Sequence, residues 1–600
     1  MNLLYITGIP IAAGLICLIL PRKIRYAHEV LTIAVSGAVF AGTVLLFFQK
    51  PVQYHFKEIM IFSLDSLSAF IIMGAAFFAL LLSVYSAVFM AESSKRPAYY
   101  GWFLMTLGSA MGAVLADHLV VLVVFWGFLG FLLYSMILTG GDQAGPAARK
   151  SLVIIGGTDV LMILGIAVIF RITGLLSMHN IYIPIGTFAS YAAFVLLAAG
   201  VFAKAGAMPF HTWVPDAARF SPTPAAALLP ASLDKLLGIY LLVRLVRDMF
   251  QINMAVKFAL MALGSITIIA AVFMALIQHD MKRLLGYHAV SQVGYMILGI
   301  GTGTTLGIIG GLFHMVNNTV YKSCLFLAAG CVEKETGTTD LDSMGGLARK
   351  MPVTYISFLV AALAISGVPP LNGFASKWLV YQGLIDLSQH SGTLWLVWLV
   401  AALFGSGLTL ASFMKLTHAV FLGTPNKNIE KKKIHDPGFL MMSPMIILAL
   451  VCVVFGIFAF YIPLRMFIIP IIGSVSYIGF WSPGMATLAV LISLAAGLII
   501  YVLSSMNVRQ AAPFIGGEKL PETSRVTGTG FYKTIRMMPG LRNLFDKSED
   551  LCFDLYEQGT ALLDKAAEYL RATHTGILNM YMLWLCLGMA VLVFLLMGGF

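Results

Sequence analysis

Charged side chains are scarce in this sequence. Of 600 residues, 11% are Asp, Glu, Lys or Arg, against about 25% in an ordinary soluble chain. Hydrophobic residues make up 59%, and the mean hydropathy is +0.91. This composition leaves too little polar surface to cover a water-facing globule, which excludes a soluble enzyme, a disordered chain and a nucleic-acid binder. The sequence therefore predicts an all-α polytopic membrane protein.

Cysteines are few and widely spaced. They form no CxxC pair and no haem-attachment sequence, and their spacings argue against iron–sulfur or zinc ligation within one chain. We therefore expect no cofactor, no metal and no catalytic chemistry carried by this chain alone. The six are Cys17, Cys324, Cys331, Cys452, Cys552 and Cys586.

Apolar runs of about 20 residues, the length that crosses a bilayer as a helix, recur along the whole chain. The first is interpreted as a retained helix, because it lacks a basic segment before it and a small-residue cleavage site after it. About sixteen spans are predicted, at 3–20, 28–48, 66–90, 99–116, 118–139, 152–170, 187–208, 224–243, 255–278, 286–302, 305–329, 353–385, 393–417, 439–461, 484–505 and 577–598.

The 38 Lys and Arg residues that produce the net charge of +11 gather in alternate loops. Placing those loops in the cytoplasm satisfies the positive-inside rule, and both termini then lie outside. The basic loops are 21–27, 91–98, 140–151, 279–285, 331–352, 418–438 and 506–576.

Two apolar segments are interrupted by proline and glycine beside a lysine. Pro209, Pro215, Pro222 and Pro224 follow Lys204, and ISGVPPLNGFASKW (365–378) places Pro369, Pro370 and Gly373 before Lys377. Broken helices at membrane depth are tolerated only inside protein or beside water. A pair of them in two halves of a chain indicates an inverted-repeat transporter, although ordinary proline kinks are the simpler reading.

The C-terminal region differs from the rest. Residues 506–540 are polar and predict a surface loop. From Leu541 to Tyr569, apolar residues recur at helical spacing and predict one amphipathic helix of about eight turns. Its polar face is mainly acidic, which favours docking along other helices or another subunit over adsorption to anionic lipid.

Ionisable residues within predicted spans are candidate functional residues, because each costs roughly 2.5–3.5 kcal/mol to insert. For Asp159 a helix-capping or cross-linking role is equally open, and Lys415 is expected to extend to the inner interface. For Lys204, Lys322 and Lys377, the alternative to a proton relay is a static ion pair. The candidates are Asp159, Lys204, Asp234, Lys235, His314, Lys322 and Lys377.

Several of these residues stand in recognisable motifs. RLLGYHAVSQVGYMILGIG (283–301), GLFHMVNNTVYKSCLFLAAG (311–330) and ISGVPPLNGFASKWL (365–379) resemble the antiporter-like subunits of respiratory complex I, membrane-bound hydrogenases and multisubunit cation/proton antiporters. AKAGAMPFHTWVPDA with SPTPAAALL (203–229) resembles the seventh helix and following loop of this family. The likeness covers roughly residues 60–420. The amphipathic segment before a final helix is similar to the long members of the family.

The resemblance implies a chain of buried lysines along a hydrated central axis. Lys204 matches the family's seventh-helix lysine, and His314 and Lys322 match its eleventh-helix histidine and central lysine. Lys377 matches the twelfth-helix relay residue, which is glutamate in some members. His314 and Lys322 are eight residues apart and so share a helix face, with Asn318 midway as a holder of bridging water.

Two departures from the family pattern affect the first half. Gly127 follows Trp126 where the fifth helix normally carries a glutamate, so the usual partner of Lys204 is missing. Pro230 stands where the family's eighth helix usually carries a histidine. Asp234 and Lys235 are shifted by about one residue from the position of the family's usual lysine in that helix. Asp234 is a candidate to replace the lost carboxylate, either through Lys235 or by reaching Lys204. The alternative is that the first half-channel of this chain is impaired.

The resemblance also implies the domain plan and the function. The plan comprises 1–98, N-terminal helices; 99–243 and 255–417, two inverted five-helix repeats; 439–505, further helices; 506–576, a cytoplasmic-side loop with the amphipathic helix; and 577–600, a final helix.

The expected function is translocation of H⁺, with Na⁺/H⁺ exchange also open, in a prokaryotic-type cytoplasmic membrane. The expected partners are other membrane and peripheral subunits of a complex-I-like or hydrogenase-like redox complex. The alternatives are the membrane subunit of a bicarbonate-uptake complex and a scaffold subunit with an impaired first half-channel.

Overall fold

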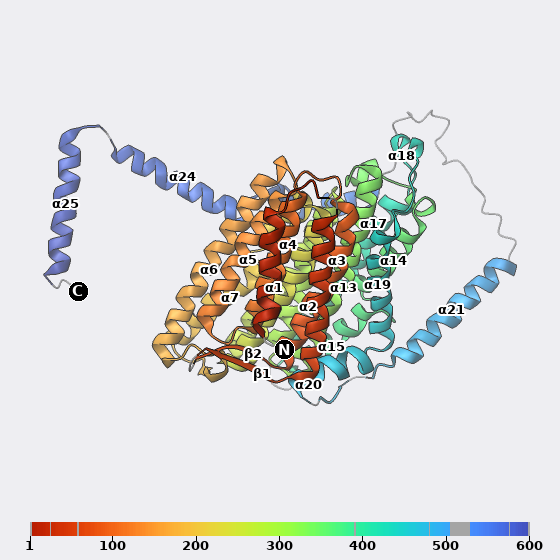
Figure 1. The fold of residues 1–600 in the computed structure, drawn as a ribbon, viewed down its shortest axis with the longest axis horizontal. Coiled ribbons are helices and arrows are strands. Elements are labelled where there is room, and N and C mark those ends of the chain that lie inside the picture. The colour runs from red at the N-terminus through yellow and green to blue at the C-terminus, as the bar shows by residue number, and fades with distance from the viewer. Residues whose placement is uncertain are drawn as a thin grey trace. The chain divides into compact units, whose positions relative to one another are not determined.

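Helices dominate the computed structural model, which describes residues 3–24, 26–56, 59–388, 392–473, 475–478, 480–503, 528–574 and 576–597. Within these residues, eleven helices are long and apolar enough to cross a membrane, and three shorter apolar helices accompany them. The chain is thus an all-α multi-pass membrane protein (Figure 1), and this expectation is confirmed. The count of sixteen spans stays a prediction. Two compact units are distinguished, Met1–Met538 and Pro539–Phe600.

The N-terminal elements precede the lysine-bearing helices. A short antiparallel hairpin, β1 with β2, connects the second helix to the third. Asp65 begins the third helix by accepting a hydrogen bond from the backbone N–H of Ser68 at 2.8 Å, as helix N-caps do. The elements are α1 (Leu3–Ile19), α2 (Ala27–Gln49), β1 (Val52–Phe56), β2 (Ile59–Leu64) and α3 (Ser66–Phe89).

The first lysine-bearing group contains a helix with unusual winding. A π-helical turn at Leu229–Leu233 immediately precedes Asp234, and such a turn inserts one residue relative to a regular α-helix. It therefore gives a physical reason for the one-residue shift of Asp234 and Lys235. The elements are α4 (Arg96–Leu115), α5 (Leu119–Leu138), η1 (Asp142–Ala144), α6 (Gly145–Thr173), η2 (Met178–Asn180), β3 (Ile183–Pro184), α7 (Phe188–Ala205), α8 (Trp213–Phe220), α9 (Thr223–Leu228), η3 (Leu229–Leu233), α10 (Asp234–Val243), η4 (Arg244–Met249) and β4 (Phe250–Gln251).

The second group is built around its longest helix, which is buried along almost its whole length. The elements are α11 (Met254–Leu276), α12 (Met281–Gly301), α13 (Thr305–Thr336), η5 (Leu341–Ser343), η6 (Leu347–Arg349), α14 (Pro352–Ser366), α15 (Asn372–Asp386), α17 (Trp395–Thr417) and η7 (His418–Leu422).

Both predicted interruptions are present. The helix α7 ends at Ala205, and Gly206 follows with φ 75°, before α8 begins at Trp213. The helix α14 ends at Ser366, and Gly367 follows with φ 81°, before α15 begins at Asn372. A positive φ favours glycine, so the same local device ends both helices. The predicted span 353–385 is thus two helices.

The elements of the rest of the described chain are α18 (Lys427–Lys431), α19 (Phe439–Ile457), η8 (Phe460–Ile468), α20 (Ile469–Ile472), α21 (Pro483–Leu503), η9 (Gly528–Tyr532), α22 (Lys533–Arg536), α23 (Leu541–Glu549), α24 (Leu555–Thr573) and α25 (Leu578–Leu596). Residues 506–527 of the predicted loop lie outside the described residues. The single amphipathic helix predicted from Leu541 to Tyr569 was wrong, because α23 and α24 are separate. Leu551, between them, has φ 59°, a conformation that L-residues do not propagate as a helix.

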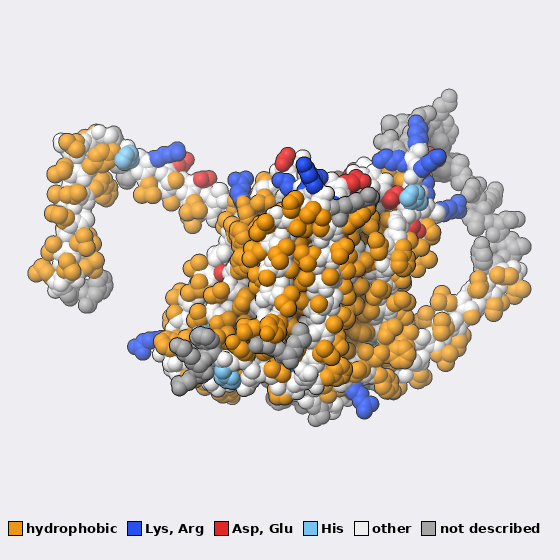
Figure 2. Space-filling model, viewed as in Figure 1, with side chains coloured by type: hydrophobic (Ala, Val, Ile, Leu, Met, Phe, Trp, Pro, Cys, Tyr) orange, Lys and Arg blue, Asp and Glu red, His pale blue; other side chains and the backbone are white. Residues whose placement is uncertain are grey.

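The surface of the helical core agrees with a membrane environment. Figure 2 shows hydrophobic side chains covering the visible flank of the packed helices, with most charged side chains toward the helix ends. Exposed apolar residues on this surface include Val124 at 64% and Val160 at 64%. In water such a surface would aggregate, whereas in lipid it needs no further cover.

Candidate functional site

The ionisable residues predicted from the sequence lie on α6, α7, α10, α13 and α15. Lys204, Lys235, His314 and Lys322 are 0% exposed, Asp234 is 1% and Lys377 is 2%, whereas Asp159 is only partly buried. Buried charges are costly unless paired or hydrogen-bonded. The bonds that each group makes therefore determine what it can do.

Lys204 lies in the last turn of α7 and faces α5. Its Nζ is 3.5 Å from the carbonyl oxygen of Trp126 and 5.5 Å from the centre of that indole ring. Two carboxylates, those of Asp234 and Asp159, interact with it electrostatically. Among the described residues, no hydrogen bond or ion pair joins either carboxylate directly to the ammonium.

The two carboxylates approach Lys204 from different helices. Asp159 comes from α6, and an added Cβ on Gly130 would lie 3.5 Å from its Oδ2. Within the described chain, Asp159 Oδ1 and Asp234 Oδ2 are buried and have no hydrogen-bond partner. A carboxyl oxygen left without a fixed partner can rotate to accept or deliver a proton. Two acids, one on α6 and one on α10, thus interact electrostatically with Lys204.

Lys235 bonds to the end of the broken helix. Its Nζ donates to the carbonyl oxygen of Ala205, the last residue of α7, and lies 6.0 Å from the Trp213 ring centre. Asp234 interacts electrostatically with both Lys204 and Lys235. The alternative roles that the sequence left open for Asp234 are therefore compatible with each other.

Lys322 occupies the middle of α13. Its Nζ donates to the carbonyl oxygen of Leu285 at 2.8 Å and lies 5.8 Å from the ring centre of Phe413. On the first-half side, its electrostatic neighbour is Lys235. The ring of His288 packs in a tilted arrangement against the same Phe413, with a centroid separation of 4.7 Å. Lys322 and His288 therefore share one aromatic contact.

His288 is a site residue that the sequence reasoning missed. It is fully buried on α12, and its Nε2 hydrogen-bonds to Ser412 Oγ at 2.7 Å. Lys322, Lys377 and Lys415 all interact with it electrostatically. A histidine inside an apolar run was the available signal, since it stands within the motif at 283–301.

His314 links three helices. Its Nδ1 hydrogen-bonds to Ser376 Oγ on α15 at 3.0 Å, and its Nε2 to Gln292 Oε1 on α12 at 3.0 Å. Lys377 is its electrostatic neighbour. Since Lys322 also bonds to α12, the predicted shared face of His314 and Lys322 is confirmed. The amide atoms of Asn318 have no hydrogen-bond partner in the described chain.

Lys377 lies beside the second break. Its Nζ donates to the carbonyl oxygen of Ile365 at 2.9 Å and lies 4.8 Å from the ring centre of Tyr295. The phenol of Tyr295 donates to Ala402 O at 2.8 Å and hydrogen-bonds to Ser406 Oγ at 2.9 Å. Lys377 therefore lies over the ring of a tyrosine whose hydroxyl connects α12 to α17.

Lys415 does not extend to the interface, and that prediction was wrong. It is 1% exposed, and its Nζ donates to the carbonyl oxygens of Leu276 at 2.7 Å and Gln278 at 2.8 Å. Those carbonyls have no helical partner because α11 ends there. They therefore satisfy the ammonium inside the protein.

Together these groups form a sequence of electrostatic neighbours through the helical core. The order is Asp159, Lys204, Asp234, Lys235, Lys322, His288, Lys377 and His314, with Lys415 beside His288. Lysine, histidine and carboxylate each hold or release one proton. Such a series offers successive groups that can each take up or release a proton.

Comparison with known proteins gives the same picture. Residues 116–409 match the model of the family described as NADH:quinone oxidoreductase/Mrp antiporter, transmembrane. A Na(+)/H(+) antiporter subunit A1 of Staphylococcus haemolyticus is 31% identical over 408 residues, which are 63% of this chain and 50% of that protein. Hydrogenase-4 component B of Escherichia coli is 30% identical over 421 residues, 66% of this chain and 62% of that protein. The chain thus spans about half the length of the first of these relatives.

A solved structure extends the likeness in fold to nearly the whole chain. A chain of the membrane-bound sulfane sulfur reductase, an archaeal respiratory membrane complex, superposes with a TM-score of 0.83 over 99% of this chain and 100% of that one, at 23% identity. The buried ionisable residues from Asp159 to Lys377 lie within residues 116–409, the segment that matches the family model, and Lys415 lies just beyond it. The helices that carry them include the motifs at 283–301, 311–330 and 365–379. The sequence similarity to the NADH:quinone oxidoreductase/Mrp antiporter transmembrane family thus covers residues 116–409 of this chain.

Proposed function

We propose that this chain is an ion-translocating membrane subunit that passes protons along the buried series from Asp159 to His314. The observation that carries the proposal is the unbroken sequence of electrostatic neighbours through two similarly broken helices. Each lysine is held by a backbone carbonyl or an aromatic ring, with no carboxylate in direct contact within the described chain. A proton leaving such a lysine breaks no fixed ion pair.

The mechanism follows from these bonds. An ammonium and a neutral amine both donate to a carbonyl, so Lys235, Lys322 and Lys377 keep their positions when they lose a proton. The field from the neighbouring group changes when that group titrates, since an added like charge disfavours the charged lysine. Charging one member of the series therefore promotes deprotonation of the next.

The proposal includes a location and partners. The chain would sit in a prokaryotic cytoplasmic membrane with its basic loops inside and both termini outside. It would work with membrane and peripheral subunits of a redox-driven complex, because nothing in the described site supplies the energy for transport. One solved structure with a similar fold is a chain of an archaeal respiratory membrane complex, and this similarity supports the proposed assembly.

Reconstitution of the purified complex in sealed liposomes tests the proposal. Driving the complex with its electron donor should acidify or alkalinise the lumen, as read by an enclosed pH dye, and an uncoupler should collapse the signal. Electron transfer without an uncoupler-sensitive pH change would contradict it. The subunits that co-purify identify the donor and acceptor.

Exchange of Na⁺ for H⁺ is a second candidate, favoured by the similarity to a Na(+)/H(+) antiporter subunit. In the same liposomes, an imposed Na⁺ gradient should then produce a pH change without electron donor. A pH change that requires electron donor and is indifferent to Na⁺ would leave protons as the ion moved.

A further inference from the structure

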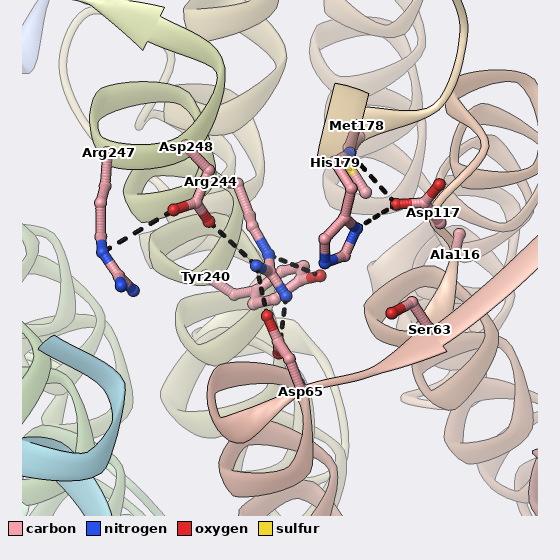
Figure 3. A pocket seen from close by; sticks show the side chains of 10 residues that line it. All are labelled: Ser63, Asp65, Ala116, Asp117, Met178, His179, Tyr240, Arg244, Arg247 and Asp248. Carbon is pink, nitrogen blue, oxygen red and sulfur yellow. Dashed lines mark hydrogen bonds and ion pairs between the residues drawn. The ribbon is translucent and has the colours of Figure 1, made fainter. Parts of the chain in front are cut away.

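A polar cavity lies at one end of the first lysine-bearing group, apart from the buried series. It has a volume of about 370 Å³, and its walls come from four places in the chain (Figure 3). At about 30 Å³ per water molecule in the liquid, it has room for roughly ten. The residues that carry the argument are Asp65, Asp117, His179, Tyr240, Arg244 and Asp248.

One wall holds a histidine–carboxylate pair. His179 Nδ1 hydrogen-bonds to Asp117, whose other carboxyl oxygen accepts from the hydroxyl of Ser177. The side chain of His179 is 39% exposed, whereas that of Asp117 is 0%. In Figure 3 the imidazole stands between Asp117 and the opposite wall, with its second nitrogen toward Tyr240 and Arg244. The pair thus presents to the cavity one ring nitrogen that makes no hydrogen bond among the residues that the structure describes.

The opposite wall is an arginine held by two carboxylates. Arg244 is 2.6 Å from Asp65 Oδ2 and 2.9 Å from Asp248 Oδ2, and its Nε donates to Tyr240 Oη at 3.2 Å. Because these charges compensate each other, this wall does not by itself attract an anion or a metal ion. Its effect is to keep the cavity polar and open.

The cavity's position relates it to the first half of the lysine series. Its lining residues stand in the α2–α3, α4–α5 and α6–α7 connections and at the end of the helix α10–η4. These connections alternate with the basic loops, so they lie on the predicted outer side. Tyr240 is six residues beyond Asp234 on α10, about 9 Å at 1.5 Å per residue.

We propose that this cavity is the outer aqueous mouth of the first half-channel, with the His179–Asp117 pair as its proton-exchanging group. This inference rests on the proposed function. The ligand is a proton carried by water. A hydronium ion in the cavity gives its proton to the free nitrogen of neutral His179, and Nδ1–H stays bonded to Asp117. The reverse step returns the proton to water.

The surroundings of His179 suit that task. Its hydrogen bond with Asp117 raises the pKa of the imidazole from an ordinary value near 6.5, so the imidazolium persists toward neutral pH. Burial and the charge of Arg244 act to lower the pKa, and the charge of Asp65 acts to raise it. The other titratable or charged groups facing this cavity are Tyr240, Arg247 and Asp248, with His118 beside Asp117.

Access to the cavity is tested first, independently of transport. His179→Cys in the assembled complex should react with a membrane-impermeant thiol reagent added to the outer side of sealed vesicles, as read by peptide mass spectrometry. Asp142→Cys, on an exposed turn in a predicted inner loop, should react from the other side. No labelling of residue 179 from either side, or labelling from the inner side, would overturn the proposal.

Proton exchange is tested next, in liposomes. His179→Gln should lower proton transport by about tenfold or more. Asp117→Asn should shift the pH profile of transport toward lower pH by about one unit, because the imidazole loses its anionic partner. A purely structural role would not move the profile. The matched control is His55→Gln, an exposed histidine of β1, which should transport like wild type.

The outcomes separate this inference from the proposed function. If Lys322→Ala stops transport while His179→Gln and Asp117→Asn leave its rate and pH profile unchanged, the mouth lies elsewhere and the relay stands. If Lys322→Ala transports as wild type does, the relay itself fails, whatever the labelling shows.

Discussion

Lys235 and Lys377 each donate a hydrogen bond to a backbone carbonyl at the end of a helix, just before one of the two helix breaks. Lys235 donates to the carbonyl of Ala205, one residue before Gly206, and Lys377 donates to that of Ile365, two residues before Gly367. Carbonyls in the last turn of a helix lack intrahelical partners, and a cation there is favoured by the helix dipole. The two halves therefore stabilise their breaks in the same way, which supports the predicted repeats 99–243 and 255–417.

Removing the amine of Lys322 should abolish translocation. Lys322 has electrostatic neighbours on both sides, Lys235 and His288, so Lys322→Ala interrupts the series at its centre. The complex should still assemble, because the lysine makes one hydrogen bond, to Leu285. Proton pumping in liposomes is the measurement. Lys334→Ala, at an exposed position on the same helix, is the matched control, and wild-type pumping by the Lys322 variant would refute its role.

A titratable group at residue 377 should matter more than its charge. A protonated glutamate can donate to the Ile365 carbonyl as the lysine does, whereas leucine cannot. Lys377→Glu should therefore retain more transport than Lys377→Leu, measured as the initial rate of the pH change at equal amounts of assembled complex. Equal rates in the two variants would indicate that Lys377 only holds the break together.

Much of this arrangement could be predicted from the sequence, because a membrane-spanning helix is recognised by its apolar composition and its length of about 20 residues. The breaks after Lys204 and before Lys377 were marked by proline and glycine, and both are present. Local patterning does not show what a side chain meets across the helix interface. That is why Lys415 was placed at the interface, although the unpaired carbonyls of Leu276 and Gln278 hold it inside.

Two other features, the break between α23 and α24 and the polar cavity at His179, could not be predicted from the sequence for physical reasons. Helical spacing in residues 541–569 continues through Leu551, so periodicity alone could not reveal the turn that separates α23 from α24. The polar cavity at His179 is assembled from connections far apart in the chain. Single residues such as Asp65, Asp117 and Asp248 resemble ordinary polar loop residues until the fold brings them together.

Asp65 should stabilise the end of the protein that contains the polar cavity in a pH-dependent way. Burial acts to raise the pKa of Asp65, but Arg244 and the hydrogen bonds from Arg244 and Ser68 outweigh it and hold that pKa well below its ordinary range. Asp65→Ser keeps a helix cap and loses the ion pair, and Asp65→Ala loses both, with the cap worth about 1 kcal/mol.

The sign of the pH effect follows from the lowered pKa. The extra stability is present above the unfolded-state value, about 3.9, and is lost as pH falls below it. The thermal midpoints of wild type and Asp65→Ser in detergent should therefore converge in acid and differ at pH 7. A difference that stays constant down to acid pH would show that the charge of Asp65 contributes nothing.

Gly367 should not tolerate a side chain. Its φ of 81° is unfavourable for L-residues, and an added Cβ would lie 3.2 Å from Lys377 Cδ. Gly367→Ala should cost about 1–2 kcal/mol and reduce transport by displacing Lys377. Gly407→Ala, in α17 with open space around its Cβ, should be neutral or stabilising. Equal thermal midpoints for the two variants would show that the left-handed conformation at 367 is dispensable.

Lys204 should be coupled energetically to Asp234. Each interacts electrostatically with the other, and breaking a buried pair by removing one member typically costs about 3–5 kcal/mol, more than removing both. We expect a smaller effect here, because no direct bond joins the two among the described residues. Asp234→Asn and Lys204→Met should therefore be non-additive, with the double variant assembling better than the two single variants predict.

The measurement is a double-mutant cycle, read as the amount of assembled complex and the rate of proton transport. The same cycle with Asp159→Asn in place of Asp234→Asn should give a smaller coupling, since Asp159 is the weaker of the two electrostatic neighbours of Lys204. Strict additivity in the Asp234 cycle would exclude coupling to Lys204. Asp234 would then act through Lys235, its other neighbour. A larger coupling to Asp159 would instead indicate that Asp159, on α6, replaces the carboxylate that is missing at residue 127.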